Sequence, residues 1–140
     1  MNEHGLAEEL LSSSIVIAVV GYSLDPSRPS NSVSRYLRSQ GFRIVPVNPL
    51  LRRVFIEGER AYDRLADIPR DARPDFVDVF RRGEFLDAVV DDAVAAGVSA
   101  LWFQLGLGNV EAARRAEEAR IRVVWDRCTA IEHRRLRRPT

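Results

Sequence analysis

The loop of residues 21–32 holds the side chains of this sequence that are best suited to ligand chemistry. It begins at Gly21, is rich in serine, proline and arginine, and joins the apolar run Ile15–Val20 to a segment with helical spacing. A strand, a loop of small residues and a helix, in this order, direct backbone N–H groups and a helix N-terminus at a phosphate. We therefore expect a nucleotide-like ligand that carries phosphate.

Several common phosphate sites do not fit this loop. All 21 basic residues are arginine, so a Walker-type loop, which needs a lysine, is excluded. The pattern G-x-G-x-x-G is absent, with Ser32 near the helix start where a later glycine would stand. The second apolar run ends in Val47-Asn48-Pro49 and lacks the carboxylate that holds the ribose of NAD. These omissions argue against a dehydrogenase.

No residues are arranged for catalysis or metal binding. The single cysteine, Cys128, excludes an internal disulfide and gives no metal-site spacing. The histidines, His4 and His133, lie in flanking segments, so neither a Ser-His-Asp nor a Cys-His arrangement is supported. No pair among the aspartates has the context of an acid–base dyad; the candidates are Asp75, Asp78, Asp87, Asp91 and Asp92. We expect no catalytic residues and no metal.

The elements that position the loop follow an alternating pattern. Runs rich in valine and isoleucine alternate with helical spacing, which is typical of a parallel sheet covered on both faces. The five runs that we interpret as strands are Ile15–Val20, Arg43–Val47, Phe76–Val79, Ala100–Phe103 and Arg122–Val124. The piece VFIEGERAY is expected to add a short strand, and RLADIPRDARP to form a surface connection. This pattern predicts a three-layer, doubly wound α/β domain with a mainly parallel five-stranded sheet.

Helix signals fill the spaces between these strands. The first helix, with Val33, Tyr36, Leu37 and Gln40 on one face, ends at Gly41. A second helix spans Gly83 to Ala96 with Phe85, Leu86, Val89, Val90 and Ala93 inward, and Gly97 closes it. Asn109 is expected to cap a third helix that carries Val110, Ala113 and Ala116. Thr129 and Glu132 have capping-box spacing before a fourth helix. A short N-terminal helix is predicted from Leu6, Leu10 and Leu11.

Length and charge limit the class of protein. The 140 residues fit one domain, 1–140, with a core of about 14–136 and a basic tail, RRLRRPT, that we expect to be solvated and loosely ordered. The formal net charge is +1, so no broad electrostatic field favours binding to nucleic acid or to a membrane surface. No apolar run approaches the roughly 20 residues of a membrane span, and no signal-peptide core is present. A cytoplasmic protein is expected.

Five segments together resemble a known family. In order they are GYSLDPSRPSNSVSRYL, GFRIVPVNP, DVFRR, WFQLG and DRC, and they extend over nearly the whole chain. This set resembles the small stand-alone CoA-binding proteins, which are similar to the CoA-binding, Rossmann-like domain of the succinyl-CoA synthetase α subunit. The resemblance implies coenzyme A or an acyl-CoA as the bound ligand. We expect no counterpart of the histidine-bearing second domain of the synthetase-like enzymes.

The resemblance also implies which residues contact CoA. The phosphates would lie on Gly21, Tyr22, Ser23, Arg28 and Ser30. The adenosine portion would contact Val47, Asn48 and Pro49, Phe80 and Arg81 would line the neighbouring crevice, and Gln104 and Gly106 would face the pantetheine arm. Purely structural alternatives stay open. The serines and Asn48 would then be turn or cap residues, Arg81 and Arg82 would be a solvated pair, and Gln104 would form hydrogen bonds with backbone groups of a loop. Cys128 is either a buried, inert thiol or one that forms a mixed disulfide with CoA.

We therefore expect a non-catalytic CoA or acyl-CoA binding protein. The alternatives are an NAD(P)-type nucleotide-dependent oxidoreductase and a binding subunit of a larger acyl-CoA enzyme. As partners we expect a CoA-type small molecule and either a second copy of the chain or a separate catalytic protein.

Overall fold

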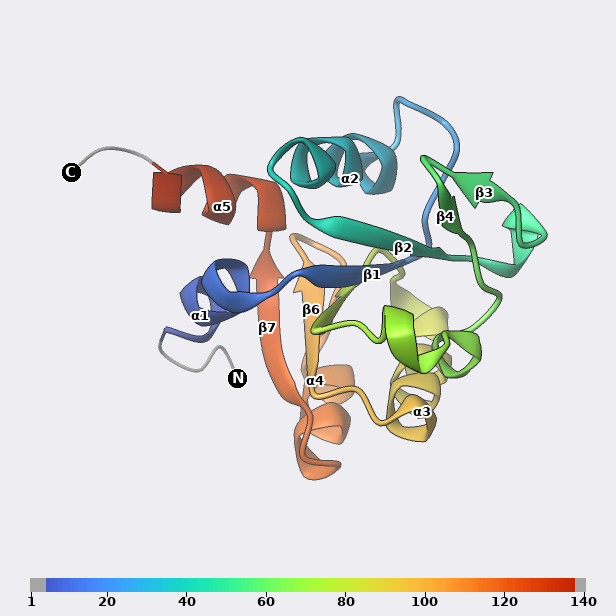
Figure 1. The fold of residues 1–140 in the computed structure, drawn as a ribbon. Coiled ribbons are helices and arrows are strands. Elements are labelled where there is room, and N and C mark those ends of the chain that lie inside the picture. Colours follow the sequence, from blue (N-terminus) through green and yellow to red (C-terminus); the bar gives the residue numbers. More distant parts are fainter. Residues whose placement is uncertain (1–4, 138–140) are drawn as a thin grey trace.

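A computed structural model describes residues 5–137 of the chain. Its centre is a sheet of five parallel strands in the spatial order β2-β1-β5-β6-β7 (Figure 1). The strands are β1 (Val16–Val20), β2 (Arg43–Val47), β5 (Phe76–Val79), β6 (Ala100–Gln104) and β7 (Arg122–Arg127). The prediction of an α/β fold with a five-stranded parallel sheet is confirmed.

The strand order reverses between β1 and β5. After β1 the chain forms the edge strand β2, and it then returns to the other side of β1 as β5. At the strand ends Val20 pairs with both Val47 and Val79. A ligand crevice forms in open parallel sheets outside the carboxyl ends of the strands at such a reversal. The residues that follow these three strands, Gly21, Asn48 and Phe80, therefore meet at the edge where a ligand is expected.

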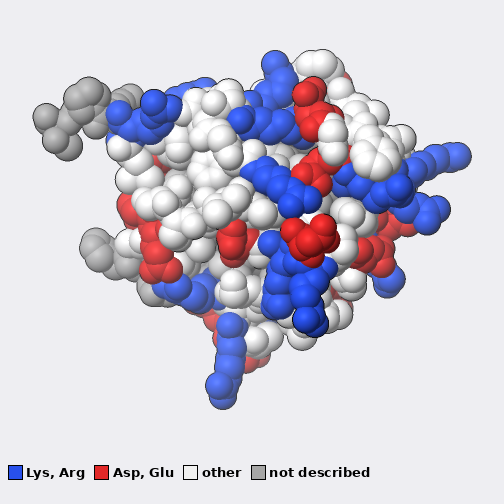
Figure 2. Space-filling view, in the orientation of Figure 1, with Lys and Arg blue, Asp and Glu red and all other residues white. Residues whose placement is uncertain are grey.

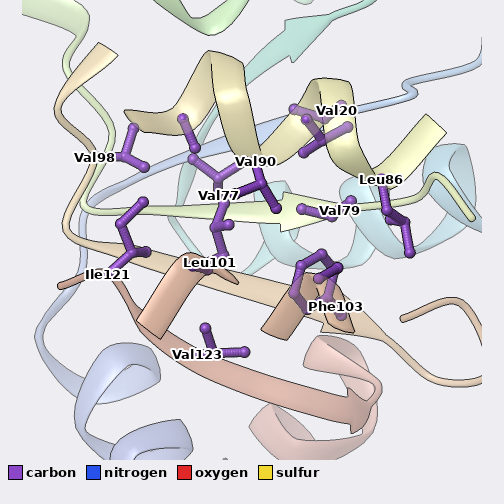
Figure 3. Packing of buried hydrophobic residues seen from close by; sticks show 14 of the residues in the cluster. Val20, Val77, Val79, Leu86, Val90, Val98, Leu101, Phe103, Ile121 and Val123 are labelled. Carbon is purple, nitrogen blue, oxygen red and sulfur yellow. The ribbon is translucent and has the colours of Figure 1, made fainter. Parts of the chain in front are cut away.

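Two separate apolar cores lie on the two faces of the sheet, because successive strand residues point in opposite directions. One core lies beneath α3 (Leu86–Ala96) and α4 (Val110–Glu118), and Figure 3 shows it; it includes Val77, Val79, Leu101 and Phe103. The other lies beneath α1 (Leu6–Ser13) and α2 (Pro29–Ser39) and includes Ile17, Val19, Phe76 and Trp102. α5 (Thr129–Arg137) packs against α1 and α2. The three predicted layers are present.

The predicted helix ends agree with the structure at three places. Asn109 caps α4, because its side-chain oxygen accepts a hydrogen bond from the backbone N–H of Ala112 at 2.8 Å. Gly97 closes α3 with φ 69°, and Gly41 follows α2 with φ 98°. Both glycines adopt the left-handed conformation that commonly ends helices.

The connection between β2 and β5 is folded against the edge of the sheet. It holds a hairpin, β3 (Phe55–Ile56) and β4 (Glu59–Arg60), and three short 3₁₀ turns, Pro49–Leu51, Leu65–Asp67 and Arg70–Ala72. The hairpin turn has positive φ at Glu57 and Gly58, as two-residue hairpin loops favour. Tyr62 then pairs in parallel with Val47 as an isolated bridge. The piece that was expected to add one short strand thus holds both strands of a hairpin.

Two details of the prediction are wrong. Phe85 was expected in the core, but a 3₁₀ turn, Gly83–Phe85, precedes α3, so Phe85 is out of register with the helix and 47% exposed. Thr129 and Glu132 do not form a capping box: the Thr129 hydroxyl is turned into the sheet, and Glu132 pairs with arginines.

On the face seen in Figure 2, arginines and carboxylates are interspersed, so charged side chains of one sign do not form a continuous patch there. Among residues 5–137, no helix is both long enough and apolar enough to cross a membrane. The last turn of α5 places Arg134, Arg135 and Arg137 in the exposed part of the helix. The remainder of the predicted basic tail lies outside the described residues.

Candidate functional site

A wide cleft of about 460 Å³ opens at the β1–β5 reversal. It is lined by the loop after β1, the first turn of α2, the segment after β5 and one residue after β6; these residues are Gly21, Ser23, Arg28, Pro29, Ser30, Phe80, Arg81, Arg82, Phe85 and Leu107. The cleft therefore combines the predicted phosphate loop with the predicted crevice after β5. Its lining has three arginines and no carboxylate, so it suits an anion.

Gly21 is the first residue of the loop, and only glycine fits there without strain. Its φ is 84°, and a Cβ atom here would stand 2.9 Å from the carbonyl oxygen of Phe80. Its N–H donates to the carbonyl oxygen of Val47 at 2.9 Å. The glycine thus admits the ends of β2 and β5 close to the loop. Its own N–H is already used, so it is not a phosphate donor.

Short-range hydrogen bonds fold the loop before any ligand is bound. The Ser30 hydroxyl accepts from the backbone N–H of Ser23 at 3.0 Å, and the Asn31 side-chain amide donates to the carbonyl oxygen of Ser23 at 2.9 Å. Asn31 also accepts from the Arg35 guanidinium at 2.9 Å. These contacts tie the loop to the first turn of α2. Ser30 therefore has the cap-like, structural role that was left open for it, and it also lines the cleft.

Three arginines supply the positive charge of the cleft. Arg28 is exposed at the start of α2, and its guanidinium makes no hydrogen bond or ion pair within residues 5–137. Arg81 lies over the ring of Phe85, with 4.6 Å between its guanidinium carbon and the ring centroid. Arg82 is exposed just before the 3₁₀ turn that precedes α3. The N-terminus of α2 carries no acidic residue in its first turn, so its partial positive charge is not offset there.

A narrower pocket of about 200 Å³ adjoins the wide cleft and shares Gly21, Arg81 and Phe85 with it. Its other lining residues come from the ends of β1 and β2, the connection after β2 and α3; they are Val20, Val47, Asn48, Pro49, Asp63, Arg64, Ala88, Val89 and Asp92. The Arg81–Phe85 contact stands between the two parts. Together they form one crevice along the sheet edge.

Two polar residues of the narrow pocket are occupied by the protein itself. The Asn48 amide donates to the carbonyl oxygen of Tyr22 at 3.0 Å, and its oxygen accepts from the N–H of Leu50 at 3.0 Å. Asp92 accepts from the backbone N–H groups of Leu65, at 2.7 Å, and Ala66, at 3.2 Å. Asn48 therefore joins the end of β2 to the phosphate loop, and Asp92 anchors the connection on α3.

Three predicted site residues lie apart from the crevice lining. Tyr22 belongs to the loop but is 2% exposed; its hydroxyl accepts from Arg38, and its carbonyl oxygen accepts from the Asn48 amide. Gly106 is exposed and donates its N–H to Asp126 at 2.9 Å. Gln104 is 4% exposed, with its amide turned into the protein. The other predicted residues line one part of the crevice or both: Gly21, Ser23, Arg28, Ser30, Val47, Asn48, Pro49, Phe80 and Arg81.

Gln104 belongs to a buried hydrogen-bond network with Asp78 and Thr129. The Gln104 amide donates to one Asp78 oxygen at 2.6 Å and to the Thr129 hydroxyl at 2.9 Å. The Thr129 hydroxyl donates to the second Asp78 oxygen at 2.9 Å. Burial raises the pKa of Asp78 to about 7, although both hydrogen bonds favour its ionised form. The network joins β5, β6 and the start of α5.

Sequence reasoning missed several crevice residues. Asp63, Arg64 and Leu107 lie in irregular segments, and no motif marks them. Phe85 was assigned to the core because it fits the helical period of α3. Asn31, which supports the crevice without lining it, carried a usable signal: a polar residue on the inward face of an amphipathic helix, two residues after its first residue, is placed to fold the preceding loop.

The remaining chemistry-bearing residues lie elsewhere. Cys128 is half-buried in a separate hollow of about 440 Å³ between α1, the end of β7 and α5. His133 contacts Tyr36, with 2.8 Å between its Nδ1 and the phenol oxygen, and burial followed by the charge of Arg137 lowers its pKa. His4 lies outside the described residues. No group of three or more potential metal-ligating side chains occurs within residues 5–137.

One family model and several known proteins are similar to this chain, and the model and one of the proteins carry a CoA-related description. The family model described as CoA binding domain matches residues 16–134. An uncharacterized Bacillus subtilis protein, YneT, is 36% identical over 126 residues, covering 90% of each chain. A protein from Thermus thermophilus has a TM-score of 0.86 and 39% identity, covering 97% of this chain and 99% of that one. A dinucleotide-forming acetyl-coenzyme A synthetase from Ca. Korarchaeum cryptofilum has a TM-score of 0.68 and 28% identity, with 82% of this chain matching 26% of the enzyme.

Proposed function

This chain belongs to the CoA-binding domain family, and we propose that it binds coenzyme A or an acyl-CoA in the crevice at the β1–β5 reversal without transforming it. The diphosphate would lie in the wide cleft, over the start of α2, and the adenosine in the narrow pocket. The pantetheine arm would leave the cleft past Leu107.

One observation carries this proposal. The wide cleft has three arginines, no lining carboxylate, and the uncompensated N-terminus of α2 at its wall. Arginine binds phosphate oxygens through charge-assisted hydrogen bonds in a fixed fork geometry. The cleft is also open enough for an extended molecule, because the narrow pocket continues it beyond Arg81. A diphosphate that joins a nucleoside to a long arm fits this shape.

The absence of reaction is part of the proposal. Among the described residues, the crevice lining holds no histidine, cysteine or lysine, and its serines hold the loop. Within that lining, Asp92 is occupied by backbone N–H groups. A purified protein that binds acetyl-CoA and returns it unchanged after prolonged incubation would support this part. Release of free thiol from acetyl-CoA at a rate above the uncatalysed one would contradict it.

Calorimetric titration of the purified protein with CoA, NAD and ATP tests the binding. We expect CoA to bind, and no CoA binding at millimolar concentration would overturn the proposal. Replacing Arg28 by alanine should weaken CoA binding by about 1.5–3 kcal/mol, because a charge-assisted hydrogen bond is lost. Arg70→Ala, an exposed arginine outside the crevice, is the matched control. An unchanged affinity of Arg28→Ala would remove Arg28 from the site.

NAD is a second candidate ligand because of Asp63. The sequence argument against NAD was the lack of a carboxylate at the end of the second strand, and the structure brings Asp63 to that place from the connection. Tighter binding of NAD than of CoA in the same titration would favour the oxidoreductase alternative. A separate catalytic partner, the third possibility, would be identified by copurification from the native host.

A further inference from the structure

Two consecutive residues, the acidic Asp63 and the basic Arg64, line the narrow pocket near the end of β2. They are brought there by Tyr62, whose N–H donates to the carbonyl oxygen of Pro46 and whose carbonyl oxygen accepts from the N–H of Asn48, both at 2.9 Å. The connection thus runs beside β2 for one residue as a parallel strand. The next residue of the connection, Asp63, enters the pocket beyond the strand end.

Apart from Arg81, which the narrow pocket shares with the wide cleft, these two side chains are the polar groups of the pocket that the fold leaves available. Asp63 is half-buried and makes no side-chain hydrogen bond or ion pair within residues 5–137. Arg64 is exposed, and its contact with Asp67 is 3.4 Å long between two exposed groups. Such a surface pair contributes little and is readily exchanged for another anion. Asn48 and Asp92, by contrast, are occupied by backbone groups.

In doubly wound domains that bind dinucleotides, a side chain beyond the end of the second strand recognises the ribose. A carboxylate there accepts a hydrogen bond from a ribose hydroxyl, and an arginine there accommodates a phosphate on the ribose. CoA carries both features on one sugar, a free 2′-hydroxyl and a 3′-phosphate. This chain presents both matching side chains, on adjacent residues.

We propose that Asp63 and Arg64 determine which nucleotide the crevice accepts, with Asp63 accepting a hydrogen bond from the ribose 2′-hydroxyl and Arg64 binding the ribose 3′-phosphate. This inference rests on the proposed function, since it assumes that the adenosine lies in the narrow pocket. It goes beyond that function because it makes the 3′-phosphate a requirement. The site then discriminates CoA from dephospho-CoA and from NAD.

Calorimetry with four compounds tests this inference. Wild type should bind CoA at least about tenfold more tightly than dephospho-CoA, and adenosine 3′,5′-bisphosphate about tenfold more tightly than its 2′-deoxy analogue. Arg64→Ala should remove the first preference and leave the second. Asp63→Ala should remove the second and leave the first. Because neither side chain supports the fold, both variants should keep the thermal unfolding midpoint of wild type.

Matched controls separate these effects from a change in net charge. Asp71→Ala and Arg70→Ala alter exposed side chains outside the crevice by the same charge and should retain both preferences. If wild type binds CoA but shows neither preference, or if the two variants keep both, the inference is wrong while the proposed function stands. If wild type binds none of the four compounds at millimolar concentration, the proposed function and the inference fail together.

Discussion

The crevice and the buried Asp78 network use the same sequence motifs in opposite ways. The segment DVFRR places Asp78 inside the protein and Arg81 in the crevice, only three residues later. In the network, polar groups satisfy each other and are shielded from water. In the crevice, the Arg28 guanidinium makes no hydrogen bond or ion pair among residues 5–137. The difference teaches that one family-like motif can hold both structural residues and candidate ligand-binding residues. The two kinds are distinguished by whether their polar side chains already have hydrogen-bond partners within the protein.

This comparison predicts that changes to the network side chains alter stability and leave ligand affinity unchanged, whereas changes to the arginine side chains of the crevice do the reverse. The largest expected effect is on the pH dependence of stability. The folded-state pKa of Asp78 is about 7, above its ordinary value of 3.8. The folded protein therefore binds more protons than the unfolded chain between these values, and Asp78 lowers stability as pH rises through that window.

Urea unfolding of wild type and Asp78→Asn across this pH range measures the effect. Relative to the variant, wild type should lose about 3 kcal/mol of unfolding free energy between about pH 5 and pH 8, at about 1.4 kcal/mol per pH unit. The dependence should level off above the folded-state pKa. Parallel pH profiles for the two proteins would show that the Asp78 carboxyl is not titrating in this range.

Gln104→Leu should give the next largest effect. It removes both donated hydrogen bonds of the amide and leaves Asp78 with one fewer donor. The unfolding free energy should fall by about 2–3 kcal/mol at pH 8, where Asp78 is ionised, and by less at pH 5. The Kd for CoA of the folded variant should change by less than about twofold. A weakened affinity with unchanged stability would instead support the contact with the pantetheine arm that the resemblance implies.

Gly21→Ala tests a residue that serves both parts of the crevice. The positive φ and the contact of a new Cβ with the Phe80 carbonyl should lower the unfolding free energy by about 1–3 kcal/mol. Gly58→Ala is the matched control, because Gly58 has φ 80° but open space around it, and should cost about 1 kcal/mol. Equal losses in the two variants would mean that the Phe80 contact relaxes without cost. CoA titration of both variants shows whether the loop geometry is needed for binding.

Arg81→Ala should have the smallest effect on the fold. Its side chain contacts the Phe85 ring at the exposed junction of the two parts, so unfolding free energy should change by less than about 0.5 kcal/mol. CoA affinity should fall about tenfold, since one cationic partner of the diphosphate is lost. A loss of stability without a loss of affinity would place Arg81 with the network residues and break the comparison.

The sequence predicts the sheet and most of the loop because both depend on local patterns. Valine and isoleucine runs mark each strand, and Gly21 marks the point where the loop leaves β1. Gln104 and Thr129 could not be assigned in the same way. Their partner, Asp78, is 26 residues from Gln104 and 51 from Thr129 along the chain, and only the strand order brings the three together. A polar residue next to a strand end gives no indication of which way its side chain turns.

A long-range backbone bridge and an irregular turn explain two other misses. Asp63 lies 16 residues after the end of β2 in a segment without periodicity, and it reaches the crevice through the backbone bridge of Tyr62. Phe85 fits a helical period, but the 3₁₀ turn shifts it outward to the crevice. Long-range pairing and a single non-helical turn are tertiary effects that propensity cannot anticipate.

The bridge at Tyr62 has a consequence for association of the chain with itself. β2 is an edge strand, and an unpaired edge is a template on which other strands aggregate. Tyr62 occupies the backbone groups of Pro46 and Asn48 on that edge, and the ion pair between Arg43 and Glu59 of the hairpin covers its beginning. The segment that brings Asp63 to the crevice thereby also protects the sheet against edge-to-edge aggregation. Resistance to aggregation and the proposed ligand recognition would thus depend on the same few residues.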